Sequence, residues 1–98
     1  DPPIDQDAWA KTMSADFAAD VLRAMVDGLA VVEWNHGSIK SVLDDFTESR
    51  GLKLGKTQAP VRVAITGRTV GPPLFESIEI LGREESLRRL GSALAKVG

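Results

Sequence analysis

The chain lacks cysteine altogether and contains a single histidine, His36, and these absences remove several classes of function. Without cysteine there is no disulfide framework, no thiolate nucleophile and no cysteine-ligated zinc site. One histidine alone supplies neither a zinc cluster nor a recognisable Ser/His/Asp triad. The longest uninterrupted apolar run covers residues 29–32, whereas a membrane-spanning helix needs roughly 20 apolar residues. No basic segment followed by an apolar stretch marks a secretory signal, so we expect no membrane partner and a cytoplasmic location.

The length and composition of the chain indicate one small globular domain. The 98 residues are 43% hydrophobic and 27% charged, an ordinary balance for a folded chain of this size. Residues 1–13 open with an extended, polar stretch that contains two prolines. We expect them to be a linker or a cut end from a preceding subdomain, which leaves residues 14–98 as the folded subdomain.

Four segments show the apolar periodicity of amphipathic helices. The first covers residues 14–33, with Ser14 as its N-cap. Gly28 within this segment predicts close packing, because glycine inside a helix otherwise costs about 1 kcal/mol relative to alanine. The other three helices are expected at residues 36–50, 73–81 and 83–97.

Residues 61–66 are ambiguous between a strand and a helix. They alternate apolar and polar residues, which is typical of a strand. No other run in the chain alternates, however, and a lone strand would leave its backbone groups unpaired. Because Pro60 suits the first turn of a helix, we favour a short helix here. The expected fold is therefore all-α, a small bundle of about five helices.

The formal net charge of −2 hides a strongly dipolar chain. Residues 1–49 hold ten acidic and three basic residues, whereas residues 50–98 hold nine basic and four acidic ones. Five bases and no acid fall between Arg50 and Arg68. Such an asymmetry points to a polyanionic partner, although a run of charge is also typical of a solvated face.

Two motifs that suggest enzyme chemistry fail on their spacing. The phosphate-binding loop has the pattern Gly-x-x-x-x-Gly-Lys-Ser/Thr, but Gly51 and Gly55, the glycines before Lys56, are one residue too close together. The adjacent acidic pairs at 44–45 and 84–85 point to different sides of a helix, so neither pair can share a substrate as acid and base. A small phosphotransferase is therefore the least favoured hypothesis.

Residues 51–76 are different in kind, because basic residues, glycines and prolines cluster there without an evident role in packing or helix formation. The turn at residues 72–74 offers a rigid backbone beside an apolar side chain, which suits splayed bases, while lysine and arginine hold phosphates. Arg62 adds a planar donor fork for a base edge or a phosphate. The segment therefore predicts contact with RNA.

Several motifs in this half of the chain closely resemble the C-terminal end of bacterial glutamyl-tRNA synthetases. They are GLKLGKTQAPVRVAITG at residues 51–67, PPLFE at 72–76, LGRE at 81–84 and LRRL at 87–90. The resemblance covers residues 14–95, and in its central part order, spacing and residue types all agree. It implies the last all-α subdomain of an anticodon-binding domain, a helical cage that grips the anticodon loop of the tRNA for glutamate beside a preceding helical subdomain.

The resemblance also assigns site residues. Contacts to the first two anticodon bases come, in that family, from the arginine of an LRVALTG segment and from the turn before LF. The matching positions in this sequence are Arg62, Gly71, Pro72 and Leu74. Pro73 stands where some members have glycine, which stiffens the turn and removes a backbone donor. From their charge, we add Lys53, Lys56 and Arg68 as contacts to the RNA backbone.

The catalytic signatures of that family, HIGH and a KMSKS-like loop, are missing from these 98 residues. The resemblance therefore implies a recognition module and not an enzyme. Its parent ligates glutamate to tRNA, and the ATP and magnesium used there belong to the catalytic domain, so no cofactor, metal or catalytic residue is expected in this chain. The alternative is a helical protein–protein docking module that uses the acidic first helix or apolar faces exposed by a removed neighbour.

Overall fold

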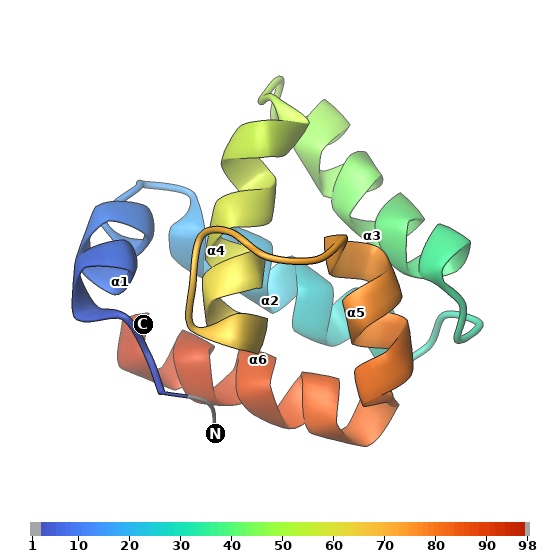
Figure 1. Ribbon diagram of the computed structural model, residues 1–98. Coiled ribbons are helices and arrows are strands. Elements are labelled where there is room, and N and C mark those ends of the chain that lie inside the picture. Colours follow the sequence, from blue (N-terminus) through green and yellow to red (C-terminus); the bar gives the residue numbers. More distant parts are fainter. Residues whose placement is uncertain (1–2, 98) are drawn as a thin grey trace.

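A computed structural model describes residues 3–97 as six helices joined by short loops (Figure 1). In chain order the helices are α1 (Gln6–Met13), α2 (Ala18–Leu29), α3 (His36–Ser49), α4 (Leu54–Thr66), α5 (Leu74–Leu81) and α6 (Arg83–Val97). This part of the chain contains no strand, which confirms the all-α fold class. None of the helices described is both long and apolar enough to cross a membrane.

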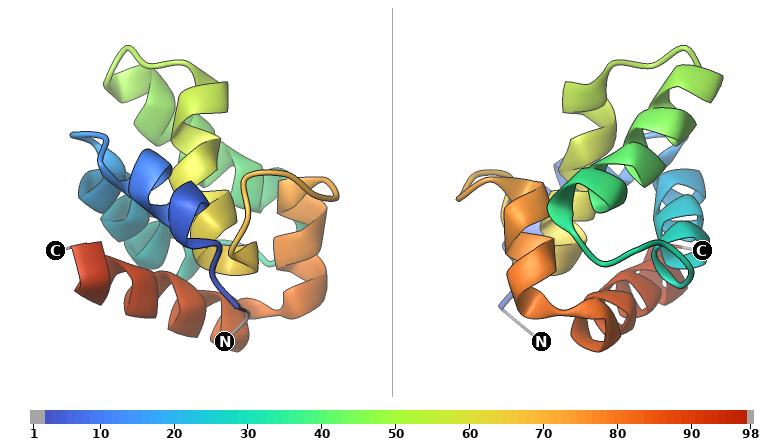
Figure 2. Two further views of the ribbon diagram at one scale, coloured as in Figure 1. Left: turned by 60° about the vertical axis from the view of Figure 1, so that its left-hand side comes forward. Right: turned by 90° about the vertical axis from the view of Figure 1, so that its right-hand side faces the viewer.

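Helix α4 is the centre of the arrangement and packs against each of the other five helices. Helix α2 contacts α1, α3, α4 and α6, while α3 packs beside α5. Figure 1 shows α6 running beneath α4, and the connection between α3 and α4 at the opposite end of the molecule. In the two views of Figure 2 the loop between α4 and α5 stands out from the helices.

The core is built around the apolar stripe of α2. Val21, Met25 and Leu29 are fully buried (0% exposed), as the periodicity of the sequence predicts. The close packing expected at Gly28 is confirmed, because a Cβ atom added there would lie 2.4 Å from Cγ1 of Val42 on α3. A residue without a side chain is therefore what lets α2 and α3 approach each other.

Residues 6–13, which we expected to belong to a linker, form helix α1 and bring the number of helices to six. The Asp5 carboxylate caps this helix by accepting hydrogen bonds from the amides of Asp7 (3.0 Å) and Ala8 (3.2 Å). Ala8, Thr12 and Met13 are buried against the rest of the domain. The prolines before Asp5 suggested an extended chain, but a strong cap and three buried positions suffice for two helical turns. The division of the chain at residue 14 remains a prediction.

Helix α2 is shorter than the helix predicted over residues 14–33. It covers Ala18–Leu29, and Ser14, which we expected to be its N-cap, is instead the C-cap residue of α1. Phe17 and Val32 pack against the core from just outside the helix. Apolar periodicity therefore continues into both flanking turns and does not mark where the helix begins and ends.

Residues 61–66 are helical, as we favoured over a strand, but α4 begins before Pro60, which lies inside it. Val61, Val63 and Ile65 alternate along the chain and are all buried. They are buried together because α4 has neighbours on several sides. The alternating pattern thus reflects a helix that is buried on more than one face.

The loop between α2 and α3 is fixed to α5 and α6 by polar contacts. The Trp34 indole donates to the backbone carbonyl of Glu79 at 3.1 Å. The His36 amide donates to Oε2 of Glu79 at 3.1 Å, and His36 Nδ1 lies 3.2 Å from Oε1. Arg83 donates to the Val32 carbonyl and lies over the Trp34 ring. The single histidine of the chain therefore has a structural place at the start of α3.

Replacing Gly28 with alanine should lower the free energy of unfolding by about 1–3 kcal/mol, because overpacking against Val42 outweighs the gain in helix propensity. Urea unfolding monitored by circular dichroism measures this change. Gly91→Ala is the matched control: Gly91 lies inside α6 with no atom within 4 Å of an added Cβ, apart from its own helix backbone and chain neighbours. That variant should gain about 0.5–1 kcal/mol. An equal gain for Gly28→Ala would contradict the packing argument.

Candidate nucleic-acid interface

The loop between α4 and α5, residues 67–73, carries two of the four predicted base contacts, and the other two lie on the helices that flank it. The first residue of the loop is tightly constrained. Gly67 ends α4 in a left-handed conformation (φ 80°) and donates its amide to the Val63 carbonyl at 2.8 Å. A Cβ atom on Gly67 would lie 2.3 Å from the carbonyl oxygen of Pro3. The Asp5 amide also donates to the Gly67 carbonyl at 3.0 Å. The N-terminal segment therefore packs directly on the start of the loop, where only glycine fits.

Arg62 holds the far end of this loop. Its Nη1 donates a hydrogen bond to the Pro72 carbonyl at 2.8 Å, and a Cβ atom on Gly71 would lie 3.6 Å from the same nitrogen. Thr66 supports the near end of the loop. Its hydroxyl donates a hydrogen bond to the Arg62 carbonyl at 2.9 Å and accepts one from the Arg68 amide at 3.2 Å. The structure thus brings Arg62, Gly71 and Pro72 together at the surface, and we call these three residues the Arg62 turn.

Leu74, the fourth predicted base contact, occupies a different environment. It is the first residue of α5 and is only 2% exposed. Pro73 lies at the N-cap position before it and is exposed, as are Gly71 and Pro72. Leu74 therefore anchors the loop in the core beneath the Arg62 turn, and its predicted contact with a base would require the loop to move.

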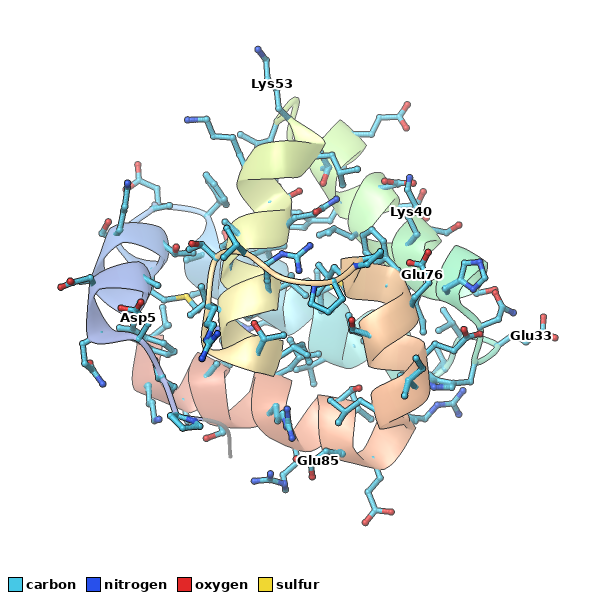
Figure 3. All side chains as sticks on the ribbon, in the orientation of Figure 1. Asp5, Glu33, Lys40, Lys53, Glu76 and Glu85 are labelled. Atoms are coloured by element: carbon cyan, nitrogen blue, oxygen red, sulfur yellow. The ribbon has the colours of Figure 1, made fainter. Side chains whose placement is uncertain are left out.

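Two of the three predicted backbone contacts, Lys53 and Lys56, lie at the start of α4, whereas Arg68 lies on the same loop as Gly71 and Pro72. Lys56 precedes Arg62 by nearly two helical turns, about 9 Å along the axis of α4. Figure 3 shows Lys53 extending from the end of the molecule opposite Glu85. Lys53, Lys56 and Arg68 are exposed, and none of them is paired with a carboxylate among residues 3–97. Their positive charge is therefore available to an external anion.

Arg50, which opens the acid-free stretch of the sequence, is already engaged within the domain. Its Nη1 lies 3.2 Å from Oδ2 of Asp20 on α2, and its guanidinium lies 4.9 Å from the centre of the Phe46 ring. In the described part of the chain no group of three or more His, Cys, Asp or Glu side chains is placed to hold a metal ion. The unpaired positive charges near α4 in the described structure therefore include those of Lys53, Lys56 and Arg68.

Lys53 and Lys56 line a surface groove together with Lys11 and Phe17, two residues to which the sequence assigned no functional role. Lys11 lies on α1, in the segment that we expected to be a linker, so it had no predicted position relative to α4. The sequence signal that identifies this helix is Asp5, because aspartate is a preferred N-cap residue. In the structure its carboxylate accepts hydrogen bonds from the amides of Asp7 and Ala8.

The C-terminal end of α4 is held from below by α6. Arg89 donates to the Ile65 carbonyl at 2.7 Å, where a positive charge also suits the helix dipole. The Glu85 carboxylate accepts hydrogen bonds from Arg88 Nε (2.9 Å) and Arg89 Nε (2.7 Å). These bonds lower the pKa of Glu85 from 4.5 to about 2, and the bond from Arg88 has the largest effect. Glu85 thus orients the arginine that supports the helix carrying the Arg62 turn.

Unpaired cations on the surface are the electrostatic feature by which nucleic-acid-binding proteins are recognised, and here they accompany an exposed turn that contains glycine and proline. A family model described as "Anticodon binding domain" matches residues 1–94. The chain belongs to this anticodon-binding family, and these residues are therefore a binding domain and not the catalytic domain of a ligase.

Curated relatives over almost the whole chain are glutamate–tRNA ligases. The ligase of Frankia casuarinae is 55% identical over 91 residues, which are 93% of this chain and 19% of that protein. The ligase of Salinispora arenicola is 52% identical over 97 residues, which are 98% of this chain and 20% of that protein. The chain thus spans about a fifth of the length of these relatives.

A solved structure supports the fold. The crystal structure of a glutamate tRNA ligase from Elizabethkingia meningosepticum, in complex with its amino acid, matches with a TM-score of 0.88. The match covers 100% of this chain and 20% of that one at 23% sequence identity. At this level of identity the likeness establishes the shared fold.

Replacing Glu85 with glutamine should destabilise the domain at neutral pH, and the difference from wild type should shrink in acid. Because the pKa of Glu85 is lower in the folded state than its ordinary 4.5, its carboxylate stabilises the fold above pH 4.5. That stabilisation is lost as the pH falls from 4.5 to about 2. Melting temperatures of both proteins across this range give the comparison, and a difference that does not change with pH would contradict the assignment.

Proposed function

We propose that this chain binds the anticodon loop of the tRNA for glutamate, as the recognition domain of a glutamate–tRNA ligase. The observation that carries the proposal is the Arg62 turn, in which an arginine from the central helix donates a hydrogen bond to the backbone of an exposed loop at Pro72. Membership of the anticodon-binding family supports the same function. The domain would act by binding and orienting RNA, without taking part in the chemical step.

The Arg62 turn offers specific groups to a nucleotide base. A guanidinium carries five N–H donors, and the bond to Pro72 uses Nη1, so donors remain for a base edge or a phosphate. Gly71 leaves room beside this guanidinium for a flat ring to approach. Pro73 has no amide to donate, so recognition at this position would rely on carbonyl acceptors and on shape. The donors of Arg62 and the exposed backbone of the turn together would read bases that are splayed out of a loop.

The activity of a whole ligase lies beyond these residues. In the proposed parent protein, glutamate is ligated to tRNA in a separate catalytic domain, which would use the ATP and magnesium. A preceding helical subdomain would contact this one, and the protein would act in the cytoplasm. No cofactor is proposed for the 98 residues themselves.

A protein–protein docking module is the second candidate, and exposed apolar side chains favour it. Val31, in the turn after α2, is 82% exposed, and Ile80 on α5 is 86% exposed. Scattered exposed apolar residues are common on soluble proteins, so this observation is weaker than the Arg62 turn. Binding of a partner that is insensitive to added RNA would favour docking.

The proposal is tested by titrating the chain with the tRNA for glutamate and with the same tRNA carrying a swapped anticodon. Both titrations are run at two salt concentrations, because phosphate contacts weaken as salt rises. We expect a dissociation constant in the range of ~1–100 μM for salt-dependent contacts, with tighter binding of the cognate anticodon. Equal affinity for the two RNAs would contradict anticodon recognition.

Replacing Arg62 with alanine should weaken binding of the cognate tRNA by about 1–3 kcal/mol and remove the preference for its anticodon. Arg23→Ala, on the exposed face of α2, removes the same charge away from the loop and serves as the control. Circular dichroism confirms that both variants remain folded. Cognate affinity that is unchanged in Arg62→Ala would show that Arg62 does not read the anticodon.

A further inference from the structure

A groove lies between the first helical turns of α4 and the connection from α1 to α2. It encloses about 670 Å³ and is open to solvent. Lysines line it from both sides: Lys11 lies on α1, Lys53 is the N-cap residue of α4, and Lys56 lies in the first turn of α4. No acidic residue of the described chain lines the groove. Its floor is apolar and includes the half-buried ring of Phe17 and the buried Pro60.

This combination fits one chemical class of partner better than others. A basic rim with an aromatic floor is how proteins hold single-stranded nucleic acid, with phosphates on the cations and bases stacked on rings. A double helix would present its phosphates but keep its bases away from the floor. An acidic peptide would satisfy the lysines, yet its short carboxylate side chains would leave the apolar floor of the groove uncovered.

The groove is continuous with the loop that carries the Arg62 turn. Thr69 lines the groove and precedes Gly71 by two residues along the same exposed loop. Lys56 is about 9 Å from Arg62 along the axis of α4, and successive nucleotides of an extended single strand are separated by a similar or shorter distance. A strand bound at the Arg62 turn therefore reaches the groove within a few nucleotides.

We infer that this groove binds the single-stranded nucleotides that flank the bases held at the Arg62 turn. One base packs on Phe17 and Pro60, and the neighbouring phosphates bind Lys11, Lys53 and Lys56. This inference rests on the proposed function, because it extends the RNA path from the turn into a second site. It assigns a role to α1, whose lysine supplies one wall of the groove.

Gly55 provides a test that does not depend on removing core residues. It lies in the first turn of α4 and lines the groove, and a Cβ atom added there would meet nothing within 4 Å. Gly55→Glu therefore introduces a carboxylate among the lysines without a clash. Helix propensity and the dipole at the helix N-terminus both favour glutamate at this position, so the variant should fold at least as well as wild type.

We expect Gly55→Glu to weaken binding of the tRNA for glutamate by about fivefold or more at low salt, with a smaller effect at high salt. Gly55→Gln has the same shape without the charge and should bind more tightly than Gly55→Glu. Gly91→Glu adds the same charge at an open position on α6 and should have little effect. If Gly55→Glu and Gly55→Gln bind alike, or if Gly91→Glu is equally impaired, the groove is not the RNA site.

The lysines and the aromatic floor give independent measurements. Lys11→Gln and Lys56→Gln should each reduce the slope of log affinity against log salt by about 0.7, whereas Lys40→Gln, which removes a lysine paired with Asp44 on α3, should not. Phe17→Leu keeps an apolar side chain but removes the ring face, and should weaken binding by about fivefold. Unchanged slopes in both lysine variants would overturn the inference.

The outcomes separate the groove from the Arg62 turn. If Arg62→Ala removes the anticodon preference while Gly55→Glu binds like Gly55→Gln, the proposed function stands and the groove is excluded. If the wild-type chain shows no anticodon preference but Gly55→Glu weakens binding of both RNAs, the groove stands and base recognition at the turn fails. If no RNA binds, or if polyglutamate binds the groove in place of RNA, the inference is wrong.

Discussion

The position of α4 at the centre of the domain is the constraint on which the rest of the structure depends. This helix packs against all five others, so it can bury apolar side chains on several sides and cannot shift without disturbing the whole core. Its two ends are also held by specific bonds. Thr57 near its start lies 2.6 Å from Thr47 of α3, hydroxyl to hydroxyl, and the carbonyl of Ile65 near its end accepts a bond from Arg89 of α6. Because Arg62 and the lysine-lined wall of the groove both lie on this helix, their relative position is as rigid as the core.

The sequence predicts best those helices that bury a single face. In α2 the residues at helical spacing are the ones that pack, and even the glycine that interrupts them marks a real close approach to α3. Helix α4 does not show this periodicity, because Val61, Val63 and Ile65 are all buried in a helix that packs against five others. The apolar residues therefore alternate along the chain, as they would in a strand. Helix α1 was not predicted, for a different reason. It has only two turns, and the prolines before Asp5 conceal the cap that starts it.

The candidate site could be predicted in its composition but not in its geometry. Long cationic side chains are almost always exposed, so a cluster of them in the sequence indicates a basic surface without any knowledge of the fold. The bond from Arg62 to the Pro72 carbonyl joins residues on either side of a loop, and nothing local in the sequence reports it. Leu74 shows the opposite failure. It follows the exposed turn directly, yet as the first apolar residue of α5 it is drawn into the core.

The overall charge of −2 conceals a surface suited to a polyanion, because what a partner meets is the local field. At physiological salt, charges more than about 8 Å apart are largely screened from each other. Several acids are neutralised within the domain: Asp20 by Arg50, Asp44 by Lys40 and Glu85 by the arginines of α6. The lysines at the start of α4 have no such partner in the described structure, so their charge acts outward. Internal pairing leaves the net charge at −2, because an ion pair removes a positive charge along with each negative one. The basic surface therefore arises from the position of the unpaired lysines, which gather around a groove that no acidic residue of the described chain lines. In the proposed function, these lysines would hold phosphates while the Arg62 turn holds bases of the same strand.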